Sequence, residues 1–358
     1  MSRYFSEKYA SLVPYVPGEQ PKERRYIKLN TNESPFPPSE KAIAAAQEAT
    51  KSLQLYSDPT ASRLHKAFAA TVGCEETMVL ATNGSDEILN FAFMAFCDSE
   101  HPAIFPDITY GFYEVFAEIN RVPYEKIPLK DDLSIDVDRF MHRKGTIFLA
   151  NPNAPTGIFL PLCEVEKIVK TTDGVVVVDE AYIDFGGESA TKLLDRYDNL
   201  LVTRTFSKSR SMAGARLGFG IAKSDLIFDL VQMKYATNPY NVNSMTMAAG
   251  LGCLDDEDYT KKNCLSIEEN RAYLTEALKD AGFVLTNSQA NFVFAKHPDF
   301  SGKALYHALR ENGILVRHFK TPRIADYLRI TIGSYDECRA VADALITLTK
   351  PLSERILP

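Results

Sequence analysis

The feature that most constrains the fold is a series of short apolar runs, each followed at once by polar residues. The runs are Met78–Ala81, Ile147–Ala150, Val175–Val178 and Leu200–Val202. Helical stretches lie between them, which is typical of a βαβ domain with a parallel sheet. Ligands of such sheets bind beyond the carboxyl ends of the strands. We therefore expect the segments that follow these runs to meet at one site.

The pattern changes after about residue 240, where a long helical stretch at 256–280 precedes short strand-like segments. This change indicates a second, smaller α+β domain. The first residues are rich in proline and polar side chains, and they read as an extended arm. The predicted division is an arm over 1–38 that joins the small domain, a large domain over 39–240 and a small domain over 241–358.

One lysine, Lys208, lies just beyond the last of these apolar runs, in the segment Thr205-Phe-Ser-Lys208. Hydroxyl groups flank it, and Arg216 follows eight positions later. A lysine at the mouth of a strand, beside groups suited to a phosphate, is what an enzyme needs to bind pyridoxal phosphate (PLP) as a Schiff base. The alternative is a surface lysine in a serine-rich loop.

The segment after the first apolar run predicts a phosphate site. An apolar helix follows Gly84-Ser85, and a helix N-terminus offers free N–H groups and a positive dipole end to an anion. Glycine allows close backbone approach, and serine adds a hydroxyl; a simple helix cap is the alternative. The residues predicted to surround the phosphate are Gly84, Ser85, Asp86, Thr205, Ser207 and Arg216.

Other polar residues after the strands suit the cofactor ring. Asp179 ends a run of valines, a costly place for an unpaired charge, and a carboxylate there would keep the pyridine nitrogen protonated. Tyr182 could donate to the phenolic oxygen, and Tyr110 could stack on the ring. Prolines fix the turn that contains Asn153, our candidate for an amide at the phenolic oxygen, with Asn151 as the alternative.

Two arginines are candidates for substrate binding. Arg329 lies within the apolar run Leu328–Ile332, where a charge needs a partner. A planar guanidinium binds a carboxylate through two parallel hydrogen bonds. Arg317 follows a second apolar run and could serve a phosphate or another acid group. The alternative for both is an exposed position on an alternating strand.

Composition narrows the classes of partner. The net charge of −7 argues against nucleic acid and anionic membrane surfaces. No apolar run approaches the roughly 18–20 residues that span a bilayer, and no signal-like stretch is present, so we expect a cytoplasmic protein. The 6 cysteines form no CxxC pair and the 6 histidines show no ligand spacing, which predicts reduced cysteines and no metal site.

Taken together, these residues resemble the fold-type I PLP enzymes of the aspartate aminotransferase superfamily, and within it the histidinol-phosphate aminotransferases. The matching segments are Val13–Tyr15, Leu29–Glu33, Tyr56–Pro59, Asn83–Glu87, Pro155–Gly157, Asp179–Tyr182, Thr205–Phe219 and Leu328–Gly333. The resemblance implies an α/β fold with a central, mostly parallel seven-stranded sheet flanked by helices, plus a smaller α+β domain. It also implies amino transfer from histidinol phosphate to 2-oxoglutarate in histidine biosynthesis, giving glutamate.

The resemblance assigns roles to individual residues. Lys208 would form the Schiff base and later move the proton between the substrate Cα and the cofactor. Asp179 would pair with the pyridine nitrogen. Tyr56 would reach the phosphate in the neighbouring subunit, which implies a homodimer. The residues expected to contact the substrate are Tyr15, Asn32, Arg317 and Arg329, with Arg329 on a carboxylate.

One position departs from the family pattern. Asparagine is common directly before Pro-Thr-Gly, where it contacts the phenolic oxygen, but this chain has Ala154. Either Asn153 reaches in its place or the contact falls to Tyr182 alone. Three other functions remain open: an aromatic amino-acid aminotransferase, a PLP decarboxylase acting on threonine phosphate, and a ligand sensor of the same fold. The acidic chain and the lack of a helix-turn-helix segment argue against the sensor.

Overall fold

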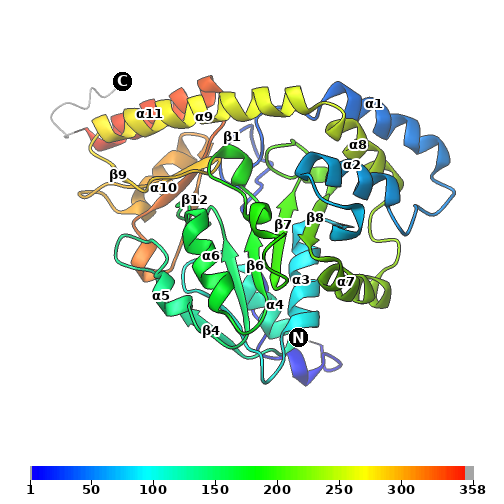
Figure 1. Ribbon diagram of the computed structural model, residues 1–358. Coiled ribbons are helices and arrows are strands. Elements are labelled where there is room, and N and C mark those ends of the chain that lie inside the picture. Colours follow the sequence, from blue (N-terminus) through cyan, green and yellow to red (C-terminus); the bar gives the residue numbers. More distant parts are fainter. Residues whose placement is uncertain (1, 351–358) are drawn as a thin grey trace.

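A seven-stranded sheet forms the centre of the computed structural model, which describes residues 2–350 (Figure 1). Its strand order is β2-β8-β7-β6-β5-β3-β4, and only β8 runs antiparallel to its neighbours. The strands are β2 (Val79–Thr82), β3 (Ala103–Pro106), β4 (Tyr124–Ile127), β5 (Thr146–Ala150), β6 (Val176–Asp179), β7 (Leu200–Thr205) and β8 (Gly218–Ala222). The predicted mostly parallel seven-stranded sheet is confirmed.

Helices cover both faces of this sheet, so its strands are apolar on both sides. In β6, Val176 and Val178 belong to one buried cluster, whereas Val177 belongs to the other. A strand buried on both faces needs a continuous apolar run rather than an alternating one. The first cluster includes side chains of α2 (Ser62–Val72), α6 (Leu162–Thr171) and α8 (Ser244–Leu254); the second includes those of α3 (Ser85–Phe96), α4 (Phe112–Asn120) and α7 (Ser224–Thr237).

A smaller antiparallel sheet has its own core. Its order is β12-β13-β10-β9, with β12 at Arg317–His318, β13 at Leu328–Thr331, β10 at Phe292–Lys296 and β9 at Val284–Leu285. Three helices pack with it: α9 (Glu257–Asp280), α10 (Gly302–Glu311) and α11 (Tyr335–Thr349). Figure 1 shows α9 along the top of the molecule, between α8 and the small sheet.

The N-terminal arm joins the smaller unit through backbone pairing. Strand β1 (Ile27–Lys28) pairs in parallel with β11 (Ile314–Leu315). After residue 240 the chain does not leave the large core at once, because α8 packs against α1 (Glu40–Ala49) and α2. Beyond residue 240, the first residue of the small unit's buried cluster is Cys264, within α9. The division at 38 and 240 stays a prediction.

Short helices complete the described secondary structure. They are α5 (Val137–Phe140), η1 (Glu7–Tyr9), η2 (Thr50–Ser52), η3 (Glu76–Met78), η4 (Ile183–Phe185), η5 (Ala190–Leu193), η6 (Ala213–Ala215) and η7 (Pro322–Ile324). Within residues 2–350, none of the helices has both the length and the apolar character to cross a bilayer. The same residues contain no group of three or more His, Cys, Asp or Glu side chains placed to hold a metal ion.

Candidate active site

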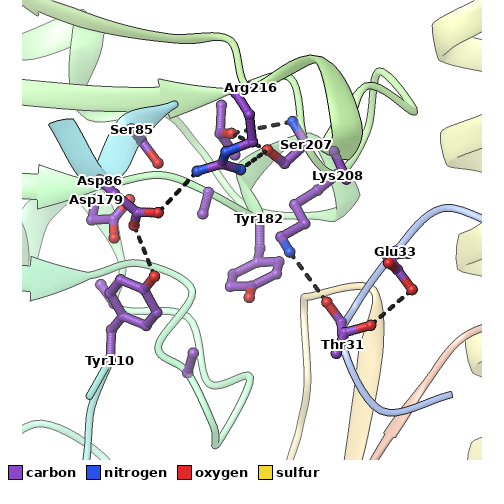
Figure 2. A pocket seen from close by; sticks show the side chains of 15 residues that line it. Thr31, Glu33, Ser85, Asp86, Tyr110, Asp179, Tyr182, Ser207, Lys208 and Arg216 are labelled. Carbon is purple, nitrogen blue, oxygen red and sulfur yellow. Dashed lines mark hydrogen bonds and ion pairs between the residues drawn. The ribbon is translucent and has the colours of Figure 1, made fainter. Parts of the chain in front are cut away.

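A pocket lies at the carboxyl ends of the central strands (Figure 2). The segments after β2, β5, β6 and β7, which we expected to converge, all contribute to it. Its lining residues are Thr31, Glu33, Ser85, Asp86, Tyr110, Ala150, Ala154, Asp179, Ala181, Tyr182, Thr205, Ser207, Lys208, Ala213 and Arg216. Thr31 and Glu33 come from the N-terminal arm, so the arm closes one side of the pocket.

The amine of Lys208 points into this pocket. Its Nζ donates to the carbonyl oxygen of Thr31 at 3.3 Å and lies 5.9 Å from the centre of the Tyr182 ring. Burial, with the positive charge of Arg329 second, lowers the pKa of Lys208 from 10.5 to about 8. A lowered pKa leaves more of the neutral amine, which is the nucleophilic form.

Asp179 ends β6 inside the protein, and two hydroxyl groups hold it. Thr203 Oγ1 donates to Oδ1 at 2.9 Å, and the Tyr113 hydroxyl donates to Oδ2 at 3.1 Å. Burial raises the pKa of Asp179 to about 6, and both donors act against that rise. Sequence reasoning missed these two residues. The parallel register that places Thr203 beside Asp179 was the available signal for the first.

Arg216 and Asp86 organise the side of the pocket beside α3. Arg216 forms an ion pair with Asp86 at 3.1 Å and donates to Ser207 Oγ at 3.4 Å. Tyr110 donates from its hydroxyl to the other Asp86 oxygen at 2.8 Å. Thr205 Oγ1 donates to Ser207 Oγ at 3.0 Å. Residues predicted from three separate segments are thus joined in one hydrogen-bonded group, as Figure 2 shows.

The start of α3 is open to an anion because its N-cap is a glycine. Gly84 has a φ of +83°, and a Cβ there would lie 2.6 Å from the Arg216 guanidinium. The first N–H groups of the helix, the Ser85 hydroxyl and Arg216 therefore share one small region. Backbone N–H groups, hydroxyls and an arginine are the donors that bind phosphate groups in proteins. These residues fit the phosphate of PLP.

The structure turns Asn153 away from the pocket. Its amide nitrogen donates to the Ile108 carbonyl and to Thr156 Oγ1, both at 3.1 Å, and its oxygen accepts from Thr109 at 2.9 Å. All of these bonds hold the turn itself, and Asn153 does not line this pocket, so its contact with the cofactor stays a prediction. Ala154 forms the pocket wall instead. The other candidate, Asn151, is likewise buried and exchanges both of its side-chain hydrogen bonds with Leu160.

Tyr182 lines the pocket, and its hydroxyl accepts a hydrogen bond from Asn32 Nδ2 at 2.9 Å. Asn32 was predicted to contact the substrate. Its side chain is buried, with only 1% exposed, and is bound to Tyr182 and Thr331. Its hydrogen-bond partners are protein groups, and the residue also lines an adjoining cavity together with Arg329, so its contact with the substrate stays a prediction.

Arg329 lies in an adjoining cavity that shares Lys208 and Tyr182 with the first. Its guanidinium carbon lies 5.3 Å from the centre of the Phe292 ring, and one terminal nitrogen donates to the Asn30 carbonyl at 3.3 Å. Its buried Nε has no hydrogen-bond partner within residues 2–350. Buried donors are normally satisfied, so this one indicates a place for an acceptor from a ligand.

The remaining predicted residues lie at the mouth of this cavity or outside it. Arg317 donates to the carbonyls of Val16 and Pro17, at 2.9 and 3.1 Å, and so ties down the arm. Tyr15 lines the same cavity and stacks on Phe112, with ring centres 4.3 Å apart. Tyr56 is 82% exposed and lines neither of these two cavities of its own chain.

Comparison with known proteins identifies the family. A model of the class I and II aminotransferases matches residues 24–345. The chain belongs to this family. Histidinol-phosphate aminotransferase 2 of Dechloromonas aromatica is 47% identical to this aminotransferase over 98% of the chain and 100% of its own length. Histidinol-phosphate aminotransferase 1 of Pseudomonas aeruginosa is 46% identical, over 96% and 99%. The family recognised in the sequence is confirmed.

Solved structures confirm the fold of this aminotransferase. The histidinol-phosphate aminotransferase of Sinorhizobium meliloti, in complex with pyridoxal-5'-phosphate, superimposes with a TM-score of 0.81. The alignment covers 91% of this chain and 92% of that one, at 23% identity. The predicted fold-type I architecture is therefore correct.

Proposed function

We propose that this aminotransferase uses PLP to transfer the amino group of histidinol phosphate to 2-oxoglutarate. The observation that carries the proposal is that the Lys208 amine and the buried Arg329 guanidinium, with its unpaired Nε, line one cavity. The Lys208 amine suits chemistry at the carbon that carries the amino group, and the Arg329 guanidinium suits an anionic part of the substrate. The 46–47% identity to histidinol-phosphate aminotransferases over nearly the whole chain supports the choice of donor.

The pocket residues divide among the parts of the cofactor. Asp179 would hold the pyridine nitrogen, Tyr110 would stack on the ring, and Tyr182 would donate to the phenolic oxygen. The phosphate would lie among Ser85, Asp86, Thr205, Ser207, Arg216 and the N–H groups that follow Gly84. When bound, PLP supplies an electron sink for the electrons left by the broken Cα–H bond of the substrate.

Lys208 has two tasks in this proposal. Its neutral amine first holds the cofactor covalently, and after the substrate displaces it the same amine removes the proton from the substrate Cα. A pKa of about 8 suits both tasks, because an effective base has a pKa near the working pH. Thr31, whose carbonyl accepts from Nζ, directs the amine within the pocket.

Arginine recognition explains how one site could take two different substrates. Glutamate presents a carboxylate on its Cα, which Arg329 would bind. Histidinol phosphate has no such carboxylate, so its phosphate would use Arg329 or the nearby Arg317. The stacked Tyr15 and Phe112 rings beside this cavity would accept the imidazole. The same rings would suit an aromatic amino acid, which is the second candidate donor.

We also propose that the active unit is a homodimer in the cytoplasm, in which Tyr56 reaches the cofactor phosphate of the neighbouring subunit. Tyr56 stacks on Tyr240 at 4.5 Å, and Leu53 and Leu55 are 51% and 65% exposed. Apolar side chains gathered on a surface favour association with another chain. A two-fold axis would bring each Tyr56 to the partner's pocket.

A single-turnover experiment tests the proposed donor. PLP-loaded enzyme is mixed with histidinol phosphate, phenylalanine or threonine phosphate in the absence of a keto acid, and cofactor absorbance is followed. Fast conversion by histidinol phosphate is the expected result. Conversion by phenylalanine alone would show that the amino donor is an aromatic amino acid. Carbon dioxide release from threonine phosphate would show that the reaction is a decarboxylation.

The variant Lys208→Ala tests the role of the lysine. It should abolish both the lysine-bound absorbance and turnover, and full turnover in this variant would refute the mechanism.

A further inference from the structure

Asn32 is a buried residue whose polar groups all have protein partners. Its backbone N–H donates to Thr331 Oγ1 at 2.9 Å, and its carbonyl accepts from Asn291 at 3.0 Å. Its side-chain oxygen accepts from Thr331 at 3.1 Å, while its side-chain nitrogen donates to Tyr182 at 2.9 Å. The residue adopts a φ of +55°, a conformation that asparagine tolerates better than most residues. It therefore joins β13 and the chain before β10 to the loop after β6.

The hydrogen-bond network fixes which way this amide faces. Thr331 Oγ1 accepts from the Asn32 N–H, so its own proton must go to an acceptor, and the Asn32 side-chain oxygen supplies one. If the amide were flipped, both the backbone N–H and the side-chain nitrogen of Asn32 would face Thr331 Oγ1. The hydroxyl proton of Thr331 would then lose the Asn32 oxygen as its acceptor. The nitrogen of Asn32 is consequently the atom that faces Tyr182.

This orientation decides what the Tyr182 hydroxyl can do. A phenol has one proton, and because its oxygen already accepts from Asn32, that proton is free to be donated elsewhere. The part of the chain that the structure describes offers it no acceptor at hydrogen-bonding distance. The Tyr182 ring is held edge-on against Phe292, with centres 5.2 Å apart, so the hydroxyl stays at the pocket wall.

We infer that Asn32 is a positioning residue that keeps the Tyr182 hydroxyl as a hydrogen-bond donor directed into the Lys208 pocket. The inference rests on the proposed function, since the acceptor would be the phenolic oxygen of PLP. That contact matters more here because the neighbouring wall is Ala154, whose side chain cannot donate. The adjacent residue, Thr31, holds the Lys208 amine, so consecutive residues of the arm set both groups.

Asn32→Asp reverses this hydrogen bond with little change in size. An ionised carboxylate only accepts hydrogen bonds, so the Tyr182 hydroxyl would donate to it instead of donating into the pocket. An anionic phenolic oxygen that loses a hydrogen-bond donor would hold a proton on the adjoining nitrogen, which is that of Lys208, more firmly. We expect the pH midpoint of the lysine-bound cofactor absorbance to rise by about one unit, the worth of one hydrogen bond to a charged oxygen.

The new charge of Asn32→Asp also raises this midpoint, so each variant is measured in wild-type and Tyr182→Phe backgrounds. Tyr182→Phe alone should raise the midpoint, and Asn32→Asp should shift it about one unit further in the wild-type background than in Tyr182→Phe. Asn32→Gly, which tolerates the positive φ and adds no charge, should shift it only where Tyr182 is present. The other charged groups that face Lys208 are Arg329, Asp86, Glu33 and Arg216, and they are the same throughout.

A matched control separates positioning from general damage. Asn291→Ala removes the hydrogen bond to the Asn32 carbonyl without touching Tyr182, and it should lower thermal stability but leave the midpoint unchanged. The inference would be overturned if Asn32→Asp shifted the pH midpoint equally in both backgrounds, or if Asn32→Gly shifted it in Tyr182→Phe. Either result would leave the proposed function unaffected. Absence of cofactor absorbance in the wild-type protein would overturn the proposed function and this inference with it.

Discussion

At the scale of single residues, Asp179 shows how a buried carboxylate is kept available for a cation. Burial favours its neutral form, whereas the hydroxyl groups of Thr203 and Tyr113 favour its charged form. These donors come from the neighbouring strand and from α4, so the carboxylate is held from two directions. Its charge state near neutral pH therefore depends on side chains that do not themselves line the pocket.

Tyr113→Phe should weaken PLP binding mainly on the acid side. Loss of one donor raises the pKa of Asp179 above its value of about 6, so the carboxylate becomes neutral at a higher pH. The acid limb of cofactor affinity should move upward by roughly one unit. Equilibrium titration of the apoenzyme with PLP across pH measures this shift. Thr203→Val should shift the acid limb in the same direction. Tyr124→Phe is the control and should leave it unchanged, because the Tyr124 hydroxyl donates to Glu114 of α4 and not to Asp179.

The pKa of Lys208 is shifted in the opposite direction from that of Asp179. Its pKa is lowered from 10.5 to about 8 in the folded protein, so between these values the unfolded chain holds a proton that the native state has released. Stability therefore rises with pH across that window. The apoenzyme should gain free energy of unfolding between pH 8 and 10.5 relative to Lys208→Met, measured by urea denaturation. A constant difference between the two proteins would contradict the lowered pKa.

At the scale of secondary structure, the junction between β2 and α3 needs a glycine for two reasons, one conformational and one steric. Gly84 has a positive φ, and it leaves the space that the Arg216 guanidinium fills. A side chain there would strain the backbone and displace the arginine together. Position 84 thus links the start of the helix to the charge beside it.

Gly84→Ala should lower both stability and cofactor affinity. The positive φ costs about 1–3 kcal/mol, and displacement of Arg216 should weaken PLP binding roughly ten-fold. Gly73→Ala is the matched control, since Gly73 also has a positive φ, of +80°, but a Cβ there meets nothing within 4 Å. It should lose stability and keep its affinity for PLP. Loss of affinity in both variants would assign the effect to stability instead.

Strands were predicted correctly where apolar runs were continuous, whereas the hydrogen-bond partners of polar side chains were not predicted. The four strand runs and the segments after them were found, because strands buried on both faces require continuous apolar sequence. The protein partners of the Asn153 amide were not foreseen, because the tight turn around it uses that amide internally. Tyr113 was missed, because nothing local in α4 indicates that its hydroxyl meets a strand-end carboxylate. Long-range pairing of this kind is not encoded in periodicity.

At the scale of the whole molecule, Tyr56 is exposed and lines neither cavity of its own chain, and we propose that it contacts a second chain. In the proposed dimer each pocket combines Lys208 of one subunit with Tyr56 of the other. A mixture of two defective variants can then contain an intact pocket. The position of Tyr56 outside the pocket of its own chain is the reason to expect this arrangement.

Lys208→Ala and Tyr56→Ala should complement each other after subunit exchange. In a hybrid dimer, one pocket carries both substitutions and the other carries neither. Random exchange of equal amounts should restore roughly a quarter of the wild-type sites. Transamination by the mixture, compared with each variant alone, gives the result. No recovery despite confirmed hybrid formation would place Tyr56 in its own subunit's chemistry.

The pairing of β1 with β11 has a consequence for how the protein is made. Ile27 meets Ile314, so the arm has no strand partner until most of the chain has left the ribosome. During synthesis the large sheet can assemble, but Thr31 and Asn32 cannot take their places beside Lys208 and Tyr182. Pairings between distant segments form late, since a long loop must close first. The newly made enzyme should therefore acquire its active site last, as the final step of its maturation.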